Sequence, residues 1–138
     1  MKGLRMADEQ PVIYFRAYEI KDFKYRKNEV EESNSKIQNT PFSISVNPSY
    51  DDEKDRAVIK VHVLFENNNI SLDITVNGYF ELMDGKKDNF EKYLVINGTA
   101  MVFPYIRSMV SMLTSLDNEN AIVLPTINTY SLWKDNKN

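Results

Sequence analysis

The stretch from residue 70 to residue 82, ISLDITVNGYFEL, alternates strictly between apolar and polar positions. A β-strand points successive side chains to opposite faces, so this period of two predicts a strand with one buried and one solvated face. Such strands are typical of antiparallel sheets that cover a core on one side only. The chain must therefore supply further strands and an apolar cover for the buried face. The buried positions would be Ile70, Leu72, Ile74, Val76, Gly78, Phe80 and Leu82.

Three earlier segments carry strand patterns. Residues 41–47 and 56–66 alternate in the same way, and residues 12–26 are rich in aromatic and β-branched side chains. Glu19 and Lys21 interrupt the apolar face of the first segment, which predicts a β-bulge or a bend near the middle of a long strand. The apolar parity of that strand comprises Ile13, Phe15, Ala17, Phe23 and Tyr25.

The period of the pattern changes after Asp84. Residues 89–96 predict a short helix, and residues 99–116 predict a longer one with Pro104 in its first turns, where a missing N–H costs least. Two apolar rows cover more than half of the longer helix, whereas one sheet needs a single stripe, so we expect contact with the sheet and with a second subunit. The helix is followed by a predicted extended tail over residues 121–133. The first row is Met101, Tyr105, Met109, Met112 and Leu116, and the second is Val102, Ile106, Val110 and Leu113.

These elements predict an α+β fold, a four-stranded antiparallel sheet followed by a long helix that packs on it and at an oligomer interface. The 138 residues, of which 42% are hydrophobic, suit one compact domain spanning residues 1–138. Residues 1–10 are expected to be disordered and residues 131–138 to form a loose tail.

The composition argues against catalysis, metal binding and nucleic-acid binding. The 17 basic and 20 acidic residues give a net charge of −3 without the concentrated basic face that phosphate binding needs. There is no cysteine, and the four glycines are too dispersed for a phosphate-binding loop. The one histidine, His62, lies on the wetter strand face beside Lys60 with no carboxylate nearby in sequence, which favours a structural role. We expect no enzyme activity, no cofactor and no metal, although a site assembled from distant Asp, Glu and Tyr residues stays open.

The beginning of the chain has no apolar stretch of the kind that a secretory signal needs, and no apolar run reaches the roughly 18 residues of a membrane span. These features, with the lack of cysteine, predict a cytoplasmic protein. Met6 would serve as a start site as well as Met1.

An adaptable apolar surface is what the sequence has in surplus. Met101, Met109 and Met112 share one helix row, and Tyr105 stands between them. Methionine and aromatic side chains repack around many shapes, which suits a promiscuous peptide-binding groove. Roles in the core or at a subunit interface explain the same residues as well.

The segments MVFPYIRSMVSMLTS and IVLPTIN resemble the SecB-like protein-export chaperones of bacteria, in which Phe-Pro-Tyr is followed two residues later by arginine. Upstream, AYEIKDFKYR is similar to the first strand of that family, and ITVNGYFEL to the end of its fourth strand. The resemblance covers about residues 12–130. It implies a homotetramer built as a dimer of dimers, with long helices between two sheets and grooves that hold extended, non-native chains.

The resemblance also implies roles for individual residues. Tyr105 matches the tyrosine of an aromatic subsite, and Ile70 falls where that subsite has a phenylalanine. A tryptophan of the family ahead of the second strand is replaced by Gln38 or a neighbour. The candidate peptide-binding residues are Tyr105, Ile70, Met101, Met109, Met112 and Phe42.

Docking to the SecA motor uses acidic residues on the outer sheet face of the family. Asp22 and Asp73 occupy two matching positions, whereas Arg26 reverses the charge at a third. The family's last helix and acidic tail have no evident counterpart, because the sequence reads SLWKDNKN after the matched region. Both departures weaken the prediction of SecA as a partner more than that of a chaperone.

The leading hypothesis is an ATP-independent holdase for unfolded polypeptides, with a possible role in export. A first alternative is a dedicated chaperone for one client of a toxin–antitoxin pair. A second is a small-molecule or structural interaction module on the same fold, since a fold does not determine a function. No nucleic acid and no membrane insertion are expected.

Overall fold

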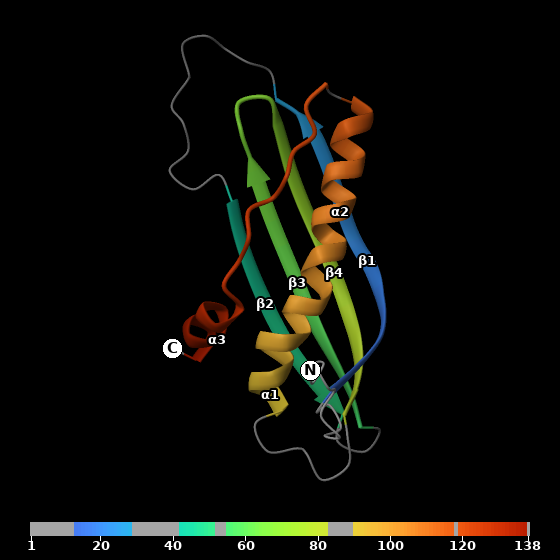
Figure 1. The fold of residues 1–138 in the computed structure, drawn as a ribbon, viewed down its shortest axis with the longest axis vertical. Coiled ribbons are helices and arrows are strands. Elements are labelled where there is room, and N and C mark those ends of the chain that lie inside the picture. The colour runs from blue at the N-terminus through green and yellow to red at the C-terminus, as the bar shows by residue number, and fades with distance from the viewer. Residues whose placement is uncertain (1–12, 29–41, 52–54, 83–89, 118, 138) are drawn as a thin grey trace, which may run out of the picture.

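A four-stranded antiparallel sheet is covered on one face by a long helix in the computed structural model (Figure 1). The structure describes residues 13–28, 42–51, 55–82, 90–117 and 119–137. The strands lie in the order β1-β4-β3-β2, so that β1 and β2 form the two edges. The α+β prediction and the four predicted strands are confirmed, although the second strand continues to Asp51, beyond its predicted end at residue 47. The strands are β1 (Ile13–Lys27), β2 (Phe42–Asp51), β3 (Arg56–Glu66) and β4 (Ile70–Leu82).

The two central strands, β3 and β4, alternate between buried and more accessible side chains along almost their whole length. Their registers place buried residues opposite each other, for example Val61 opposite Val76 and Val63 opposite Ile74. The apolar parity of β4 faces the helix, as its strict alternation predicts. Polar residues occupy the other face, called the outer face below.

β1 contains two bulges. Its pairing with β4 shifts register between Phe15 and Ala17 and again between Ile20 and Asp22, which confirms the predicted irregularity. Each extra residue reverses which side chains point to the core. Ala17, predicted on the core parity, therefore lies opposite Tyr79 on the outer face, and the prediction for Ala17 was wrong. Between the bulges, Tyr18 and Ile20 turn to the helix side instead, opposite Gly78 and Val76.

The helical region is continuous along the chain. α1 (Phe90–Tyr93) leads into a π-helical turn, η2 (Leu94–Gly98), and then directly into α2 (Thr99–Asp117). The π turn joins the two helices that were predicted separately. Pro104 lies in the first turns of α2, as predicted, but the turns of α1 and η2 before it mean that it does not stand at a free helix start. None of the described helices is long and apolar enough to cross a membrane.

The helix approaches the sheet closely at Gly78. A Cβ atom at this position would lie 2.4 Å from Cγ2 of Val102 on α2, which is far inside van der Waals contact. Only glycine therefore allows α2 to lie at its present distance from β4.

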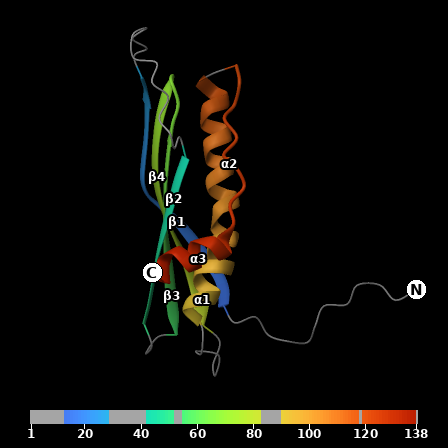
Figure 2. The same cartoon turned by 90° about the vertical axis from the view of Figure 1, so that its left-hand side faces the viewer.

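The segment after α2 starts beside that helix, crosses over the β2 side of the sheet without secondary structure up to Asn128 and then forms α3 (Thr129–Lys137), as Figures 1 and 2 show. The Oδ1 atom of Asn128 accepts hydrogen bonds from the backbone N–H groups of Tyr130 and Ser131, at 3.0 and 3.2 Å. This is the geometry of a helix N-cap. The predictions of an extended tail through Trp133 and of a loose tail from residue 131 were wrong, because this cap starts a helix. The apparent lack of a last helix is corrected by the same finding.

Several predictions fall on residues that the structure does not describe. They concern residues 1–10 and the position of Gln38. Residue 138 also lies outside the described residues.

Candidate functional site

The two predicted apolar rows of α2 lie in different environments. Val102, Ile106 and Val110 are fully buried on the sheet, and Leu113 is half-buried. In the other row Met109 is half-buried and packs against the core. The remaining members of that row are exposed, Met101 to 38%, Tyr105 to 42%, Met112 to 67% and Leu116 to 81%. α2 thus carries an apolar stripe that its own sheet leaves uncovered.

Aromatic rings connect this stripe to β1. The ring of Tyr105 stacks on that of Tyr18 with 4.7 Å between centroids, and it lies 5.8 Å from the ring of Phe15. Phe15 in turn contacts the buried Phe80. Ile20, next to Tyr18 on the helix side of β1, is 46% exposed. We call this region the α2–β1 surface, consisting of Met101, Tyr105, Met112 and Leu116 of α2 with Tyr18 and Ile20 of β1.

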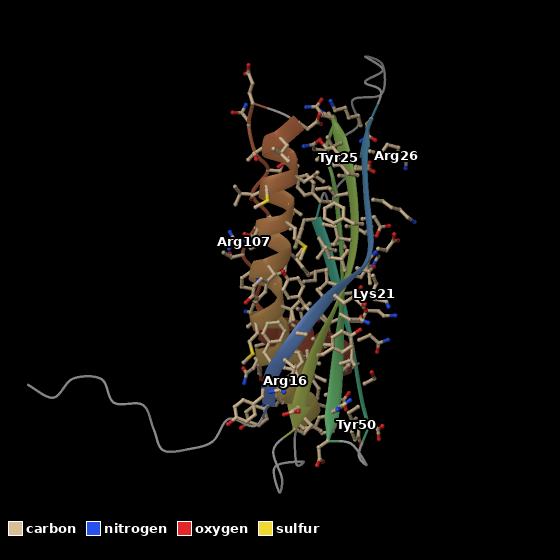
Figure 3. All side chains as sticks on the ribbon, turned by 90° about the vertical axis from the view of Figure 1, so that its right-hand side faces the viewer. Arg16, Lys21, Tyr25, Arg26, Tyr50 and Arg107 are labelled. Carbon is tan, nitrogen blue, oxygen red and sulfur yellow. The ribbon has the colours of Figure 1, made fainter. Side chains whose placement is uncertain are left out.

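A polar contact holds the end of α2 on β1. Asp117 accepts a hydrogen bond of 2.6 Å from the hydroxyl of Tyr25 and lies 3.0 Å from Nζ of Lys27. The hydrogen bond from Tyr25, followed by that from Lys27, lowers the pKa of Asp117. Asp117 raises the pKa of Lys27 in return. Figure 3 shows β1 running beside α2, with Tyr25 near the end of the strand.

The structure does not bring all six predicted peptide-binding residues together. Ile70 is buried at the start of β4, opposite Lys27. Gly78, which pairs with Tyr18, is eight residues further along β4. Ile70 and Gly78 are therefore roughly 26 Å apart along the extended strand. Phe42 is half-buried on the edge strand β2, and its ring packs edge-on against that of Phe103 with 6.3 Å between ring centroids. The pairing of Ile70 with Tyr105 in one subsite is therefore not supported by this geometry.

Tyr18 and Ile20 belong to the candidate site although the sequence pattern did not select them. Both take their places from the bulges of β1, which change parity twice within six residues. The interrupting charges Glu19 and Lys21 were the only signal of that change.

The other flank of α2 is covered by the chain itself. Nε of Arg107 donates to the carbonyl of Leu124 at 3.1 Å, and Oγ of Ser111 donates to the carbonyl of Ile122 at 2.9 Å. The small polar residues of α2 permit this close approach. Figure 3 shows Arg107 on the side of α2 away from the sheet.

The two acidic candidates for docking share the outer face. Asp22 lies opposite Thr75 and Asp73 opposite Lys24, so the two are diagonal neighbours on β1 and β4. Asp22 pairs with Lys24 at 3.5 Å, whereas Asp73 lies 2.7 Å from Nε2 of His62. Arg26 is exposed further along β1.

His62 thus has a carboxylate partner that its sequence neighbours did not reveal. The register between β3 and β4 supplies Asp73 from 11 residues away. A depression of about 360 Å³ beside this pair is lined by Ser45, Val46, Asn47, Lys60, His62 and Thr75. Among the described residues, no group of three or more His, Cys, Asp or Glu side chains could hold a metal ion.

Comparison with known families identifies this architecture. The family model of the preprotein translocase subunit SecB matches residues 7–138, nearly the whole chain. The chain belongs to the SecB family. The resemblance seen in the sequence is thereby confirmed.

Among SecB-like structures, the fold is similar to a SecB-like chaperone of Mycobacterium tuberculosis solved in complex with a ChAD peptide from the HigA1 antitoxin. The TM-score is 0.67 at 12% identity, with 84% of this chain and 91% of that chain covered. A protein of unknown function from Streptococcus agalactiae matches with a TM-score of 0.58 at 12% identity, with 83% and 97% covered. At these identities the likeness shows the fold alone.

A relative by sequence is an uncharacterized protein of Methanocaldococcus jannaschii. It is 30% identical over 121 residues, which cover 83% of this chain and 77% of the relative. The SecB family assignment therefore rests on the family model.

Proposed function

We propose that this SecB-family protein is an ATP-independent chaperone that holds unfolded polypeptides on the α2–β1 surface. The exposed apolar stripe of α2 beside the stacked rings of Tyr105 and Tyr18 carries the proposal. Contiguous exposed apolar surface marks interaction sites, and methionine and aromatic side chains adapt to varied partners. Burial of apolar surface is favourable by itself, so holding a chain in this way needs no nucleotide.

Suppression of aggregation tests the proposal. The purified protein should suppress the aggregation of a refolding client at a near stoichiometric ratio, and Tyr105→Ala should weaken that effect. Tyr14→Ala is a matched control, because Tyr14 is 38% exposed but lies opposite Glu81 on the outer face. If both variants suppress aggregation as well as the unchanged protein does, client binding lies elsewhere on the molecule. If none of the three proteins suppresses aggregation, the holdase function is refuted.

A dedicated chaperone for one antitoxin-like client is the second candidate function. The similar structure from Mycobacterium tuberculosis contains an antitoxin peptide, which favours this candidate. Arg26 also favours this candidate, because it reverses the charge at a position where the family uses an acidic residue to dock SecA. The two candidates differ in client range: a dedicated chaperone should rescue one client and leave unrelated unfolded proteins to aggregate.

The outer face is the proposed place for a delivery partner such as SecA. Asp22 and Asp73 are diagonal neighbours on this face, and each has a basic neighbour, Lys24 and His62 respectively. The double variant Asp22→Asn and Asp73→Asn should abolish any binding to purified SecA while client binding stays unchanged. Binding of SecA at unchanged affinity by this variant would remove the outer face from the proposal.

Assembly into a dimer of dimers is proposed to use part of the same stripe. Leu116 is the most exposed of its residues, near the end of α2. Leu116→Glu should dissociate a tetramer in light-scattering measurements, because a carboxylate would be buried without a partner. An unchanged mass for this variant would exclude the end of the stripe from the interface.

A further inference from the structure

The segment from Ala121 to Pro125 lies extended along α2 on the flank opposite the α2–β1 surface (Figure 2). It forms no strand pairing with any part of the chain that the structure describes. Its backbone is held by side chains instead. Besides the bonds from Arg107 to Leu124 and from Ser111 to Ile122, the N–H of Ile122 donates to Oγ1 of Thr114 at 2.8 Å.

The side chains of this segment alternate as they would in a bound extended peptide. Ile122 is half-buried, Val123 is 66% exposed, and Leu124 is completely buried in the core. One apolar side chain is thus inserted, and its neighbour points to solvent. All three hydrogen bonds go to backbone atoms, so they do not depend on which residues the segment contains.

We propose that Arg107, Ser111 and Thr114 form a binding site for extended polypeptide backbone, and that the segment 121–125 is its internal occupant. The ligand class is an extended chain with an apolar residue in the position of Leu124. A client segment of this kind competes with the internal occupant and displaces it. The inference rests on the proposed holdase function and deepens it, because it names a second contact through which a client of any sequence is held.

Competition has a physical consequence for affinity. A site that is mostly filled by its own chain binds a client with the intrinsic affinity reduced by the fraction of time that the site is free. Loosening the internal segment should therefore strengthen client binding. A segment with only a structural role predicts the opposite result, since its loss would damage the surface that binds the client.

Hydrogen exchange in the unchanged protein tests displacement directly. The probe is reduced, carboxymethylated α-lactalbumin, a permanently unfolded chain. Its addition should speed exchange of the Ile122 amide by about tenfold or more, since this amide is protected by Thr114, while the buried part of α2 around Ile106 stays protected. Bound probe with unchanged or slower exchange at Ile122 would overturn the inference. Absence of any probe binding would instead refute the proposed function.

Two variants give an independent reading. Leu124→Ala removes the inserted side chain and should tighten probe binding by about 3- to 10-fold, as expected when an internal competitor is weakened. Val123→Ala changes the adjacent, solvent-facing side chain and should leave the affinity unchanged. Weaker or unchanged binding by a folded Leu124→Ala variant would contradict competition. If that variant does not fold, the exchange experiment on the unchanged protein decides.

Discussion

The ring of Tyr105 on α2 stacks on the ring of Tyr18 on β1, with 4.7 Å between centroids and 27° between planes. This contact exists only because a bulge turns Tyr18 towards the helix. It joins the edge strand to the exposed stripe of α2, and the two residues remain 41% and 42% exposed. The pair is therefore both a structural contact and the centre of the proposed client-binding surface.

A double-mutant cycle measures the structural part of this contact. Tyr18→Ala and Tyr105→Ala should each lower the free energy of unfolding, with a coupling energy of about 0.5–1.5 kcal/mol between them. Urea unfolding of the four proteins gives this value. Strictly additive effects would mean that the two rings do not stabilise each other.

Gly78→Ala should destabilise the fold by about 1–3 kcal/mol, because the new methyl group would overlap Val102. Val102→Ala, which removes the overlapping Cγ2 atom, should recover part of this loss when combined with it. Gly98→Ala is the control, since its Cβ would lie 3.3 Å from its nearest neighbours, Leu94 and Phe80. Thermal unfolding that ranks Gly98→Ala as the more harmful change would contradict the close approach at Gly78.

Stability at low pH should depend on Asp117. Its pKa is lowered in the folded state, chiefly by the hydrogen bond from Tyr25, so its contribution is complete above the ordinary aspartate pKa of about 3.9. The contribution is lost as the pH falls through the lowered value. Asp117→Asn should therefore reduce stability at neutral pH and flatten the acid limb of the stability curve.

Stability at high pH should depend on Lys27. Its pKa is raised by Asp117, so the stabilisation is present below the ordinary lysine pKa and is lost as the pH rises through the raised value. Asp117→Asn should flatten the alkaline limb of the stability curve as well. Tyr25→Phe should weaken the acid limb while retaining the ion pair with Lys27. Identical pH profiles for all three proteins would show that the contact does not stabilise the fold.

Asn128→Ala should destabilise α3, because it removes the oxygen that accepts hydrogen bonds from Tyr130 and Ser131. N-cap substitutions of this kind cost about 0.5–2 kcal/mol, and Asn128→Asp should retain most of the effect because aspartate also caps helices. Faster amide exchange at Tyr130 and Ser131 in the alanine variant alone would verify the cap. The same exchange rates in all three proteins would contradict it.

Much of the fold was predictable because its signals are local. The alternation from Ile70 to Leu82 and the two rows of α2 follow directly from strand and helix periodicity. The bulges of β1 were predictable as an interruption but not in their effect on Ala17, Tyr18 and Ile20. A shift of register changes the parity of every following residue, and its position depends on the partner strand.

The surroundings of Pro104, Asn128 and His62 differ from those that their sequence neighbours predict. Pro104 suits a first turn by itself, but the π turn before Thr99 continues the helix from α1. Asn128 is a residue type that often caps helix N-termini, but the extended pattern before it predicted that the chain stays extended beyond it. His62 finds Asp73 only through strand pairing.

By itself the sequence determined the α+β class and the presence of an apolar surface larger than one sheet can cover, because these depend on periodicity along the chain. Its resemblance to the family depended instead on short motifs such as MVFPYIRSMVSMLTS. Only the tertiary structure decided which residues share that surface. It placed Tyr18 beside Tyr105, separated Ile70 from both, and seated Leu124 on the opposite flank of α2. The physical reason is that strand register, bulges and helix packing depend on contacts between segments far apart in sequence, and these contacts cannot be predicted from a local pattern.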